Sequence, residues 1–185
     1  SAVVANVASD DDAAITAALG SATAEYLSAT LLGGDTIGVS SWSSTLLAAV
    51  RSLPPFRTNV ANYVVQTVGG VGAPTAETYA AELVTGLARA TRAQAVFLPA
   101  PGVLSSGAVA AALMADPSIS HVMKLWDALT VSLVGIGDVE PSLLLRQSGN
   151  VVSDRALEEL RAVGAVGDVC LRFYDADGEP VKATL

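Results

Sequence analysis

Residues 35–53 read Asp-Thr-Ile-Gly-Val-Ser-Ser-Trp-Ser-Ser-Thr-Leu-Leu-Ala-Ala-Val-Arg-Ser-Leu, and this stretch decides the fold of the chain. Residues 36–39 are apolar and rich in β-formers, which predicts a short buried strand. Residues 45–53 are rich in Leu and Ala, and Pro54 and Pro55 follow them, so this segment is predicted to be a helix that ends before the prolines. The junction between strand and helix holds serines on both sides of Trp42.

This serine-rich junction has two interpretations. The first amides of a helix have no acceptor within the helix, and the helix dipole favours negative charge there, so the junction suits an anion. Ser and Thr hydroxyls would add donors at the same point. The simpler interpretation is that Ser43 or Ser44 only caps the helix. The residues alone leave both interpretations open.

The composition indicates one domain, or part of one. The chain has 185 residues, of which 51% are hydrophobic, enough for one core. Its net charge of −8 repels phosphate backbones, so the segment is not expected to bind nucleic acid itself. No apolar run is long enough to span a bilayer and no signal pattern opens the chain, so no membrane association is expected. The single cysteine, Cys170, excludes an internal disulfide and favours a reducing compartment, so we expect a cytoplasmic protein.

The sequence predicts neither a metal site nor a cofactor. The lone histidine, His121, cannot supply a multi-histidine site. Residues 10–12 are aspartates that fit the first turn of a helix better than a cation site. Residues 175–178, Asp-Ala-Asp-Gly, fit a β-turn, because an EF-hand loop needs its glycine two positions later.

Strands and helices are predicted to alternate along the chain. We expect strands at residues 2–7, 36–39, 63–68, 94–98, 129–134 and 173–174. We expect helices to begin near residues 9, 45, 74, 105, 118 and 153. In the first helix the predicted buried face is Ile15, Leu19, Ala22, Tyr26 and Thr30, and in the third it is Tyr79, Leu83 and Leu87.

This alternation predicts an α/β fold, a mostly parallel sheet with helices on both faces. Ligands of such sheets bind beyond the carboxyl ends of the strands. The loops predicted to converge there are residues 41–45, 66–72, 99–102 and 135–138.

Motifs of common enzyme classes are absent from the sequence. There is no phosphate-binding P-loop, and residues 38–42 lack the last glycine of a nucleophile elbow. The glycines at 70 and 72 do not complete a dinucleotide fingerprint, because Thr75 stands where a glycine is needed. His121 and Lys124 fall on a predicted helix, where a surface or core role is the ordinary one. No catalytic residue is assigned.

Five runs, in this order, resemble one protein family. They are residues 38–46 (Gly-Val-Ser-Ser-Trp-Ser-Ser-Thr-Leu), 64–72 (Val-Val-Gln-Thr-Val-Gly-Gly-Val-Gly), 98–101 (Leu-Pro-Ala-Pro), 133–137 (Leu-Val-Gly-Ile-Gly) and 164–168 (Gly-Ala-Val-Gly-Asp). Together they are similar to the effector-binding domain of the sorbitol-operon type of bacterial sugar-binding transcriptional regulators, and the resemblance covers nearly the whole chain. It implies a Rossmann-like fold of the phosphosugar isomerase and coenzyme A transferase group.

The resemblance also implies a set of ligand-binding residues. The loop that would hold a phosphate carries Ser41, Ser43, Ser44 and Thr45, and Asp168 would face sugar hydroxyls as a hydrogen-bond acceptor. The remaining pocket residues would be Gln66, Gly69, Gly70, Pro101 and Gly137. Some family members that bind bisphosphates carry an arginine where this chain has Val68, so a second phosphate is not expected.

The partners implied by the resemblance are a sugar or sugar-phosphate effector and further copies of the chain, as a dimer or tetramer. Operator DNA would be bound only through an N-terminal domain that residues 1–185 do not contain. The family's usual C-terminal continuation, a glycine-rich segment with a lysine, is also not among these residues, so we expect an effector-binding domain that is incomplete at its C-terminus.

A phosphosugar isomerase on the same fold is the alternative, because a fold alone does not decide activity. An isomerase needs a base next to a carbonyl-adjacent carbon. The acids in pocket loops that could serve are Asp138 and Asp168.

Overall fold

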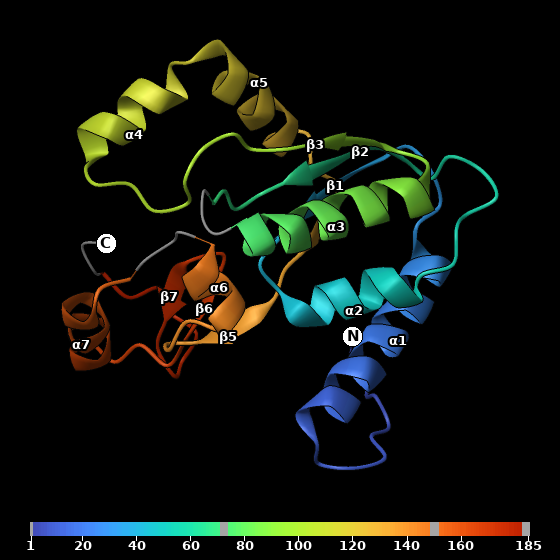
Figure 1. Cartoon of the computed structure of the whole chain (residues 1–185), viewed down its shortest axis with the longest axis horizontal. Coiled ribbons are helices and arrows are strands. Elements are labelled where there is room, and N and C mark those ends of the chain that lie inside the picture. The colour runs from blue at the N-terminus through green and yellow to red at the C-terminus, as the bar shows by residue number, and fades with distance from the viewer. Residues whose placement is uncertain (1, 71–73, 149–151, 183–185) are drawn as a thin grey trace.

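A four-stranded parallel sheet forms the centre of the computed structural model, which describes residues 2–70, 74–148 and 152–182 (Figure 1). The strand order is β3-β2-β1-β4, and each neighbouring pair is parallel. The bounds are Asp35–Val39 for β1, Ala61–Gln66 for β2, Gln94–Val96 for β3 and Val131–Leu133 for β4. The prediction of an α/β fold with a mainly parallel sheet is confirmed.

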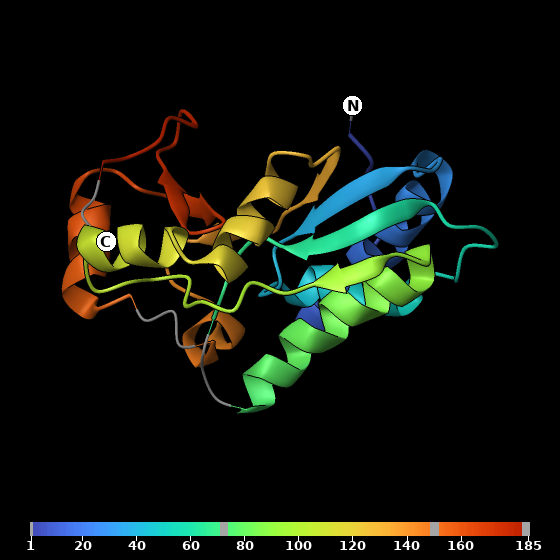
Figure 2. The same cartoon turned by 90° about the horizontal axis from the view of Figure 1, so that it is seen from above.

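Helices cover both faces of this sheet, as predicted. One face carries α1 (Asp12–Thr30), α2 (Ser44–Ser52) and α3 (Pro74–Thr91), and the other carries α5 (Pro117–Trp126), while α4 (Gly107–Met114) lies next to α5 beyond the ends of the strands (Figures 1 and 2). Ile37 and Val39 of β1 and Val64 and Val65 of β2 have no exposed surface. Continuous apolar strands of this kind are typical of parallel sheets that are buried on both faces.

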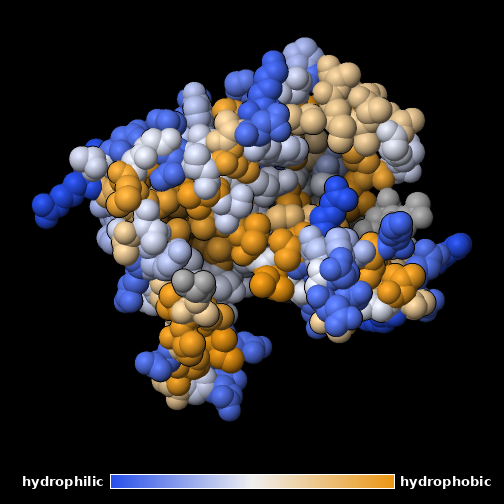
Figure 3. Space-filling model, turned by 180° about the vertical axis from the view of Figure 1, so that it is seen from behind, coloured by the Kyte–Doolittle hydropathy of each residue, from blue (hydrophilic) through white to orange (hydrophobic). Residues whose placement is uncertain are grey.

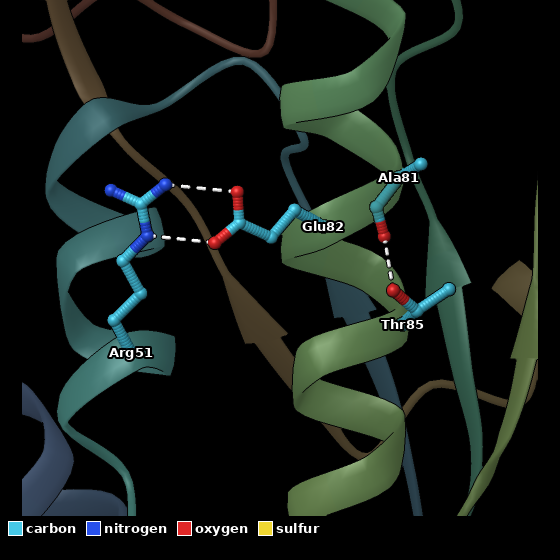
Figure 4. Close-up of polar contacts among 4 residues, drawn as sticks. All are labelled: Arg51, Ala81, Glu82 and Thr85. Carbon is cyan, nitrogen blue, oxygen red and sulfur yellow. Dashed lines mark hydrogen bonds and ion pairs between the residues drawn. The ribbon is translucent and has the colours of Figure 1, made fainter.

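The α2 and α3 helices lie side by side, and an ion pair joins their outer surfaces. Arg51 donates to both carboxylate oxygens of Glu82, at 2.7 and 2.8 Å (Figure 4). The pair raises the pKa of Arg51 and lowers that of Glu82, chiefly through this hydrogen bond. Both side chains are exposed, so the pair contributes little to stability.

The predicted buried face of the first helix is wrong. The side of α1 that packs on α2 carries Gly20, Ala24 and Leu27, whereas Leu19 is 40% exposed and Tyr26 is 53% exposed. The reason is close packing: a Cβ on Gly20 would lie 2.8 Å from the backbone carbonyl carbon of Ala48, so small residues face the neighbouring helix. Apolar surface is exposed on the projecting part of the molecule, which contains the N-terminal segment and the start of α1 (Figure 3).

Three further details differ from the sequence prediction. Residues 2–7 form no strand, because no neighbouring strand edge pairs with them. The first helix is capped by Asp11, whose carboxylate accepts the N–H of Ala14, and begins later than residue 9. Tyr79 of α3 is 43% exposed, since the helix extends beyond the sheet edge on which Leu83 and Leu87 are buried.

A smaller antiparallel layer lies beside the parallel sheet (Figure 2). It consists of β5 (Ile136–Asp138), β6 (Gly167–Val169) and β7 (Arg172–Tyr174), together with α6 (Leu143–Gln147) and α7 (Asp154–Ala162). Val139, Leu157, Leu160, Ala165 and Phe173 form its own apolar core. The sequence predicted α7 and the turn at residues 175–178, in which Gly178 donates to Asp175, but predicted a loop where β5 lies.

The order of the parallel strands reverses between β1 and β4. The chain leaves β1 toward β2 and β3 and returns through α4 and α5 to place β4 on the other side of β1. In open α/β sheets the crevice at such a reversal, beyond the carboxyl ends of the two strands, is the usual ligand site. The loops that follow β1 and β4 are therefore the first place to look for one.

Candidate functional site

A pocket of about 380 Å³ lies at this reversal of strand order. Its lining residues come from the loop after β1, from β5 and its flanks, and from the β6–β7 hairpin. They are Ser40, Trp42, Ser43, Ser44, Thr45, Val68, Gly135, Ile136, Gly137, Asp138, Glu140, Ser142, Leu145, Asp168, Cys170 and Leu171. We call it the switch-point pocket.

The start of α2 forms one wall of the switch-point pocket. Ser43 is the N-cap of α2, and its Oγ accepts the N–H of Leu46 at 3.3 Å. The capping interpretation is therefore correct, and it is compatible with an anion site. The N–H groups of Ser44 and Thr45, in the first turn, still have no acceptor within the helix. Together with the hydroxyls of Ser44 and Thr45, they offer donors to the pocket.

Asp168 on β6 lies in the opposite wall. It faces Gly137 of β5 in the antiparallel register, and its carboxylate accepts the N–H of Leu171 at 2.9 Å. A Cβ on Gly137 would collide with Oδ1 of Asp168, so a larger residue there would displace the carboxylate from this position. Burial raises the pKa of Asp168, and the hydrogen bond from Leu171 acts in the opposite direction.

Ser41 and Gln66 lie behind the pocket and not in its wall. Ser41 is 1% exposed, donates to the carbonyl of Val68 at 3.1 Å and accepts from Nε2 of Gln66 at 2.9 Å. The amide oxygen of Gln66 also accepts the N–H of Leu98 at 3.1 Å. The two side chains thus connect the loops after β1, β2 and β3. Because their hydrogen-bonding groups are already used, we assign them a positioning role.

Trp42 fixes the same loop from the other side. Its indole N–H donates to the carbonyl of Gly69 at 3.0 Å, and its ring lies over Gly70, where a Cβ would collide with it. Gly70 therefore serves the packing of Trp42. The sequence did not identify Trp42 as a pocket residue, because its contacts are to residues distant in sequence.

The four loops predicted to converge divide between two pockets. The loops after β1 and β4 supply the switch-point pocket, whereas Gly69 and Pro101, from the loops after β2 and β3, line a separate cavity of about 680 Å³. The last residues of the predicted loop 66–72, Val71 and Gly72, lie outside the described residues. The smaller pocket is the candidate site, because the start of α2 with its serine and threonine hydroxyls and the carboxylate of Asp168 both line it.

The sequence did not reveal the β6–β7 turn that closes the pocket. Cys170 and Leu171 have φ values of 54° and 63°, the arrangement of a two-residue type I′ turn. The usual sequence of such a turn is Asn-Gly, whereas this turn is Cys170-Leu171, so the sequence gives no signal for it. Burial raises the pKa of the Cys170 thiol, and the nearby hydroxyls of Ser40 and Thr67 act in the opposite direction.

Acidic groups dominate the charge of the switch-point pocket. Its lining holds Asp138, Glu140 and Asp168, and no Lys, Arg or His is among the described lining residues. Glu140 is paired with Arg161 of α7 at 2.8 Å, which offsets one charge. No cluster of three His, Cys, Asp or Glu side chains among the described residues is placed to hold a metal ion. Such a pocket suits hydroxyl donors on a ligand.

No helix in the described ranges is both long enough and apolar enough to span a membrane.

Residues 1–185 match the family described as "Putative sugar-binding domain". The deoxyribonucleoside regulator of Bacillus subtilis (strain 168) is 31% identical over 168 residues, which cover 91% of this chain and 52% of that protein. The sorbitol operon regulator of Klebsiella pneumoniae is 28% identical over 156 residues, 82% of this chain and 48% of that protein. The chain spans about half the length of these relatives.

The solved structure of the full-length sorbitol operon regulator SorC from Klebsiella pneumoniae superposes with a TM-score of 0.85 at 26% identity. The match covers 99% of this chain and 58% of that chain. The predicted resemblance to regulators of the sorbitol-operon type is confirmed. The chain belongs to the sugar-binding domain family that bacterial transcriptional regulators of this type contain.

Proposed function

We propose that the chain is the ligand-sensing part of a bacterial transcriptional regulator and binds a sugar or sugar phosphate in the switch-point pocket. The observation that carries the proposal is a single pocket with two unlike walls. One wall is the hydroxyl-rich start of α2, and the other is the carboxylate of Asp168. A sugar phosphate has the matching pair of ends, an anion and a set of hydroxyl donors.

At the anionic end, Ser43, Ser44 and Thr45 hold the phosphate. The free N–H groups of the first turn and the helix dipole stabilise its charge without a lysine or arginine. The absence of a cationic side chain from the described lining favours one phosphate over two. Val68 in the lining is apolar and offers no charge to a second phosphate, which agrees with this expectation.

At the other end, Asp168 accepts hydrogen bonds from sugar hydroxyls. An ionised carboxylate only accepts, so it selects groups that donate. Gly137 provides the space that the carboxylate needs, and Ser41, Gln66, Gly69 and Gly70 support the loop after β1. Pro101 lies outside this pocket, in the lining of the larger cavity.

The regulator would act on operator DNA through a separate DNA-binding part, and it would work as a dimer or tetramer in the cytoplasm. The relatives named above are regulators, and the net charge of −8 disfavours DNA binding by this chain itself. The effector then acts by binding one arrangement of the protein more tightly than another.

A phosphosugar isomerase is the second candidate, and the raised pKa of Asp168 is the observation that favours it. A carboxylate with a raised pKa is a better general base near neutral pH. We retain the sensing function as the first choice, because the named relatives are regulators of transcription.

One experiment separates the two functions. The protein is titrated by calorimetry with a panel of pentoses, hexoses, polyols and their phosphates, and each mixture is then assayed for aldose–ketose conversion. The sensing function predicts saturable binding of at least one compound and no conversion. Turnover that Asp168→Asn abolishes would establish the enzyme, and no binding by any compound would contradict both.

A further inference from the structure

The larger cavity, of about 680 Å³, is separate from the switch-point pocket. It lies beyond the carboxyl ends of β2 and β3, between the α4–α5 pair and the β6–β7 hairpin, and we call it the α4–α5 pocket. Val68, Cys170 and Leu171 line both cavities and form the wall between them. Its volume falls in the range of roughly 300–1,000 Å³ that is usual for small-molecule sites.

The lining of the α4–α5 pocket is apolar. Leu113, Ile119, Met123 and Trp126 come from the two helices, and Phe173 comes from the hairpin. A sugar would leave most of its hydroxyls without partners against such a surface, at a cost in free energy. The pocket therefore suits a bulky apolar body, and methionines in its wall allow it to adapt to different shapes.

The charge of the α4–α5 pocket is opposite to that of the switch-point pocket. Arg172 on β7 is the one charged side chain among the described lining residues, and no carboxylate accompanies it. Arg172 takes part in none of the ion pairs between described residues. A guanidinium at the edge of an apolar cavity is a suitable partner for a carboxylate, sulfonate or phosphate on a ligand.

A buried hydroxyl also lies in this wall. Thr67 lines the pocket, and its Oγ1 is buried beside the thiol of Cys170, a weak hydrogen-bonding group, without a nitrogen or oxygen partner among the described residues. A bound polar group or water at this wall would satisfy this hydroxyl more fully.

We propose that the α4–α5 pocket is a second binding site, for a molecule with a bulky apolar body and one anionic group that Arg172 binds. This site does not depend on the function of the switch-point pocket. Because the two cavities share a wall, a ligand in one changes the surroundings of the other, and any coupling between them is reciprocal.

The test uses two dyes with the same aromatic body. Anilinonaphthalenesulfonate carries one sulfonate, and N-phenylnaphthylamine lacks it. The chain has two tryptophans, Trp42 in the switch-point pocket and Trp126 in the α4–α5 pocket. In Trp42→Phe, only Trp126 can transfer energy to a bound dye. We expect one dye molecule per chain, with efficient transfer from Trp126 in this variant.

Two substitutions decide whether the site is the proposed one. Arg172→Gln should weaken binding of the sulfonate roughly tenfold, the effect of losing a charge-assisted hydrogen bond, and that of the neutral dye less than twofold. Ala110→Phe, which places a ring in the pocket, should abolish binding of both dyes. Arg155→Gln on α7 removes an exposed charge outside both pockets and should change neither. The circular dichroism spectrum of each variant establishes that it is folded.

Three results would overturn the proposal. One is equal affinity of parent and Arg172→Gln for the sulfonate, and another is binding that survives Ala110→Phe in a folded protein. The third applies where residues 1–185 are part of a longer polypeptide. If that polypeptide binds neither dye, other residues fill the pocket and it is not a ligand site.

Discussion

Asp168 and Gly137 lie opposite each other on neighbouring strands and together shape one wall of the switch-point pocket. The carboxylate is held by the N–H of Leu171, and the missing side chain of Gly137 leaves room for it. The sequence indicated Asp168 through the family resemblance, and Gly137 through the same resemblance and as part of the loop predicted at residues 135–138. It could not link them, because their pairing depends on the antiparallel register of β5 and β6.

Thr45→Val tests the anionic end of the site. Valine keeps the shape of threonine and removes one hydroxyl donor, so affinity for a sugar phosphate should fall by roughly 1–3 kcal/mol. Calorimetry measures the change. Thr85→Val on α3 is the matched control, because the Thr85 hydroxyl donates to Ala81 within its own helix, away from both pockets (Figure 4). Unchanged affinity in Thr45→Val would place the anion elsewhere.

The raised pKa of Asp168 gives sugar binding a pH dependence. Protonation of this carboxyl begins at a higher pH than for an ordinary aspartate, and the protonated form accepts hydroxyl donors less well. Affinity for the sugar part, taken as the ratio of sugar phosphate to inorganic phosphate affinity, should fall as the pH is lowered through this raised pKa. Asp138 and Glu140 also face the pocket, so Asp168→Asn is the control, and its ratio should vary less with pH.

The raised pKa of Asp168 also makes the stability of the fold depend on pH. The folded protein binds the proton of Asp168 more tightly than the unfolded chain does. Ionisation of this group therefore reduces the free energy of unfolding as the pH rises through its folded pKa, and protonation restores it at lower pH.

Among the secondary-structure elements, the parallel unit could be predicted from the sequence, whereas the antiparallel layer could be predicted only in part, at α7, at residues 173–174 of β7 and at the turn of residues 175–178. β1, β2 and β4 are apolar runs followed by glycine or serine, which local patterns reveal. β5 and β6 have three residues each, and the turn that follows β6 lacks glycine, so these two strands leave almost no periodic signal. The half of the site that comes from β6 was therefore accessible only through resemblance.

The contact between α1 and α2 depends on Gly20. Its added Cβ in Gly20→Ala would lie 2.8 Å from the backbone of Ala48, and overpacking costs about 1–3 kcal/mol, more than the helix-propensity gain of about 1 kcal/mol. Urea unfolding should show a net loss of stability. Gly107→Ala at the start of α4 meets no atom within 4 Å and should leave stability unchanged or slightly higher. A Gly20→Ala variant as stable as Gly107→Ala would mean that α1 packs differently.

Gln66 should prove to be a positioning residue. Gln66→Leu removes its bonds to Ser41, Val68 and Leu98, so the free energy of unfolding should fall by about 3 kcal/mol. The exposed Asn62 on the same strand makes one hydrogen bond, to Gly34, and Asn62→Ala should cost less than about 1 kcal/mol. Ligand affinity should fall in Gln66→Leu only because the loops shift. Lost affinity with full stability would instead mean direct contact with the ligand.

At the scale of the whole molecule, the switch-point pocket joins two layers of unlike construction. The α2 wall belongs to the parallel sheet unit, and the Asp168 wall belongs to the antiparallel layer. A ligand held at both ends ties the layers together, and it stabilises the arrangement in which both walls can reach it. Such a ligand-dependent arrangement is what a sensing domain needs in order to influence a partner.

The measurement that tests this two-walled site most directly is a calorimetric comparison of parent and Asp168→Asn. Each protein is titrated with inorganic phosphate and with the sugar phosphate that binds the parent most tightly. Because the proposed site places Asp168 against the sugar hydroxyls and not the anion, the variant should bind the sugar phosphate roughly tenfold more weakly and inorganic phosphate as well as the parent does. Equal losses for both ligands, or no loss for either, would contradict it.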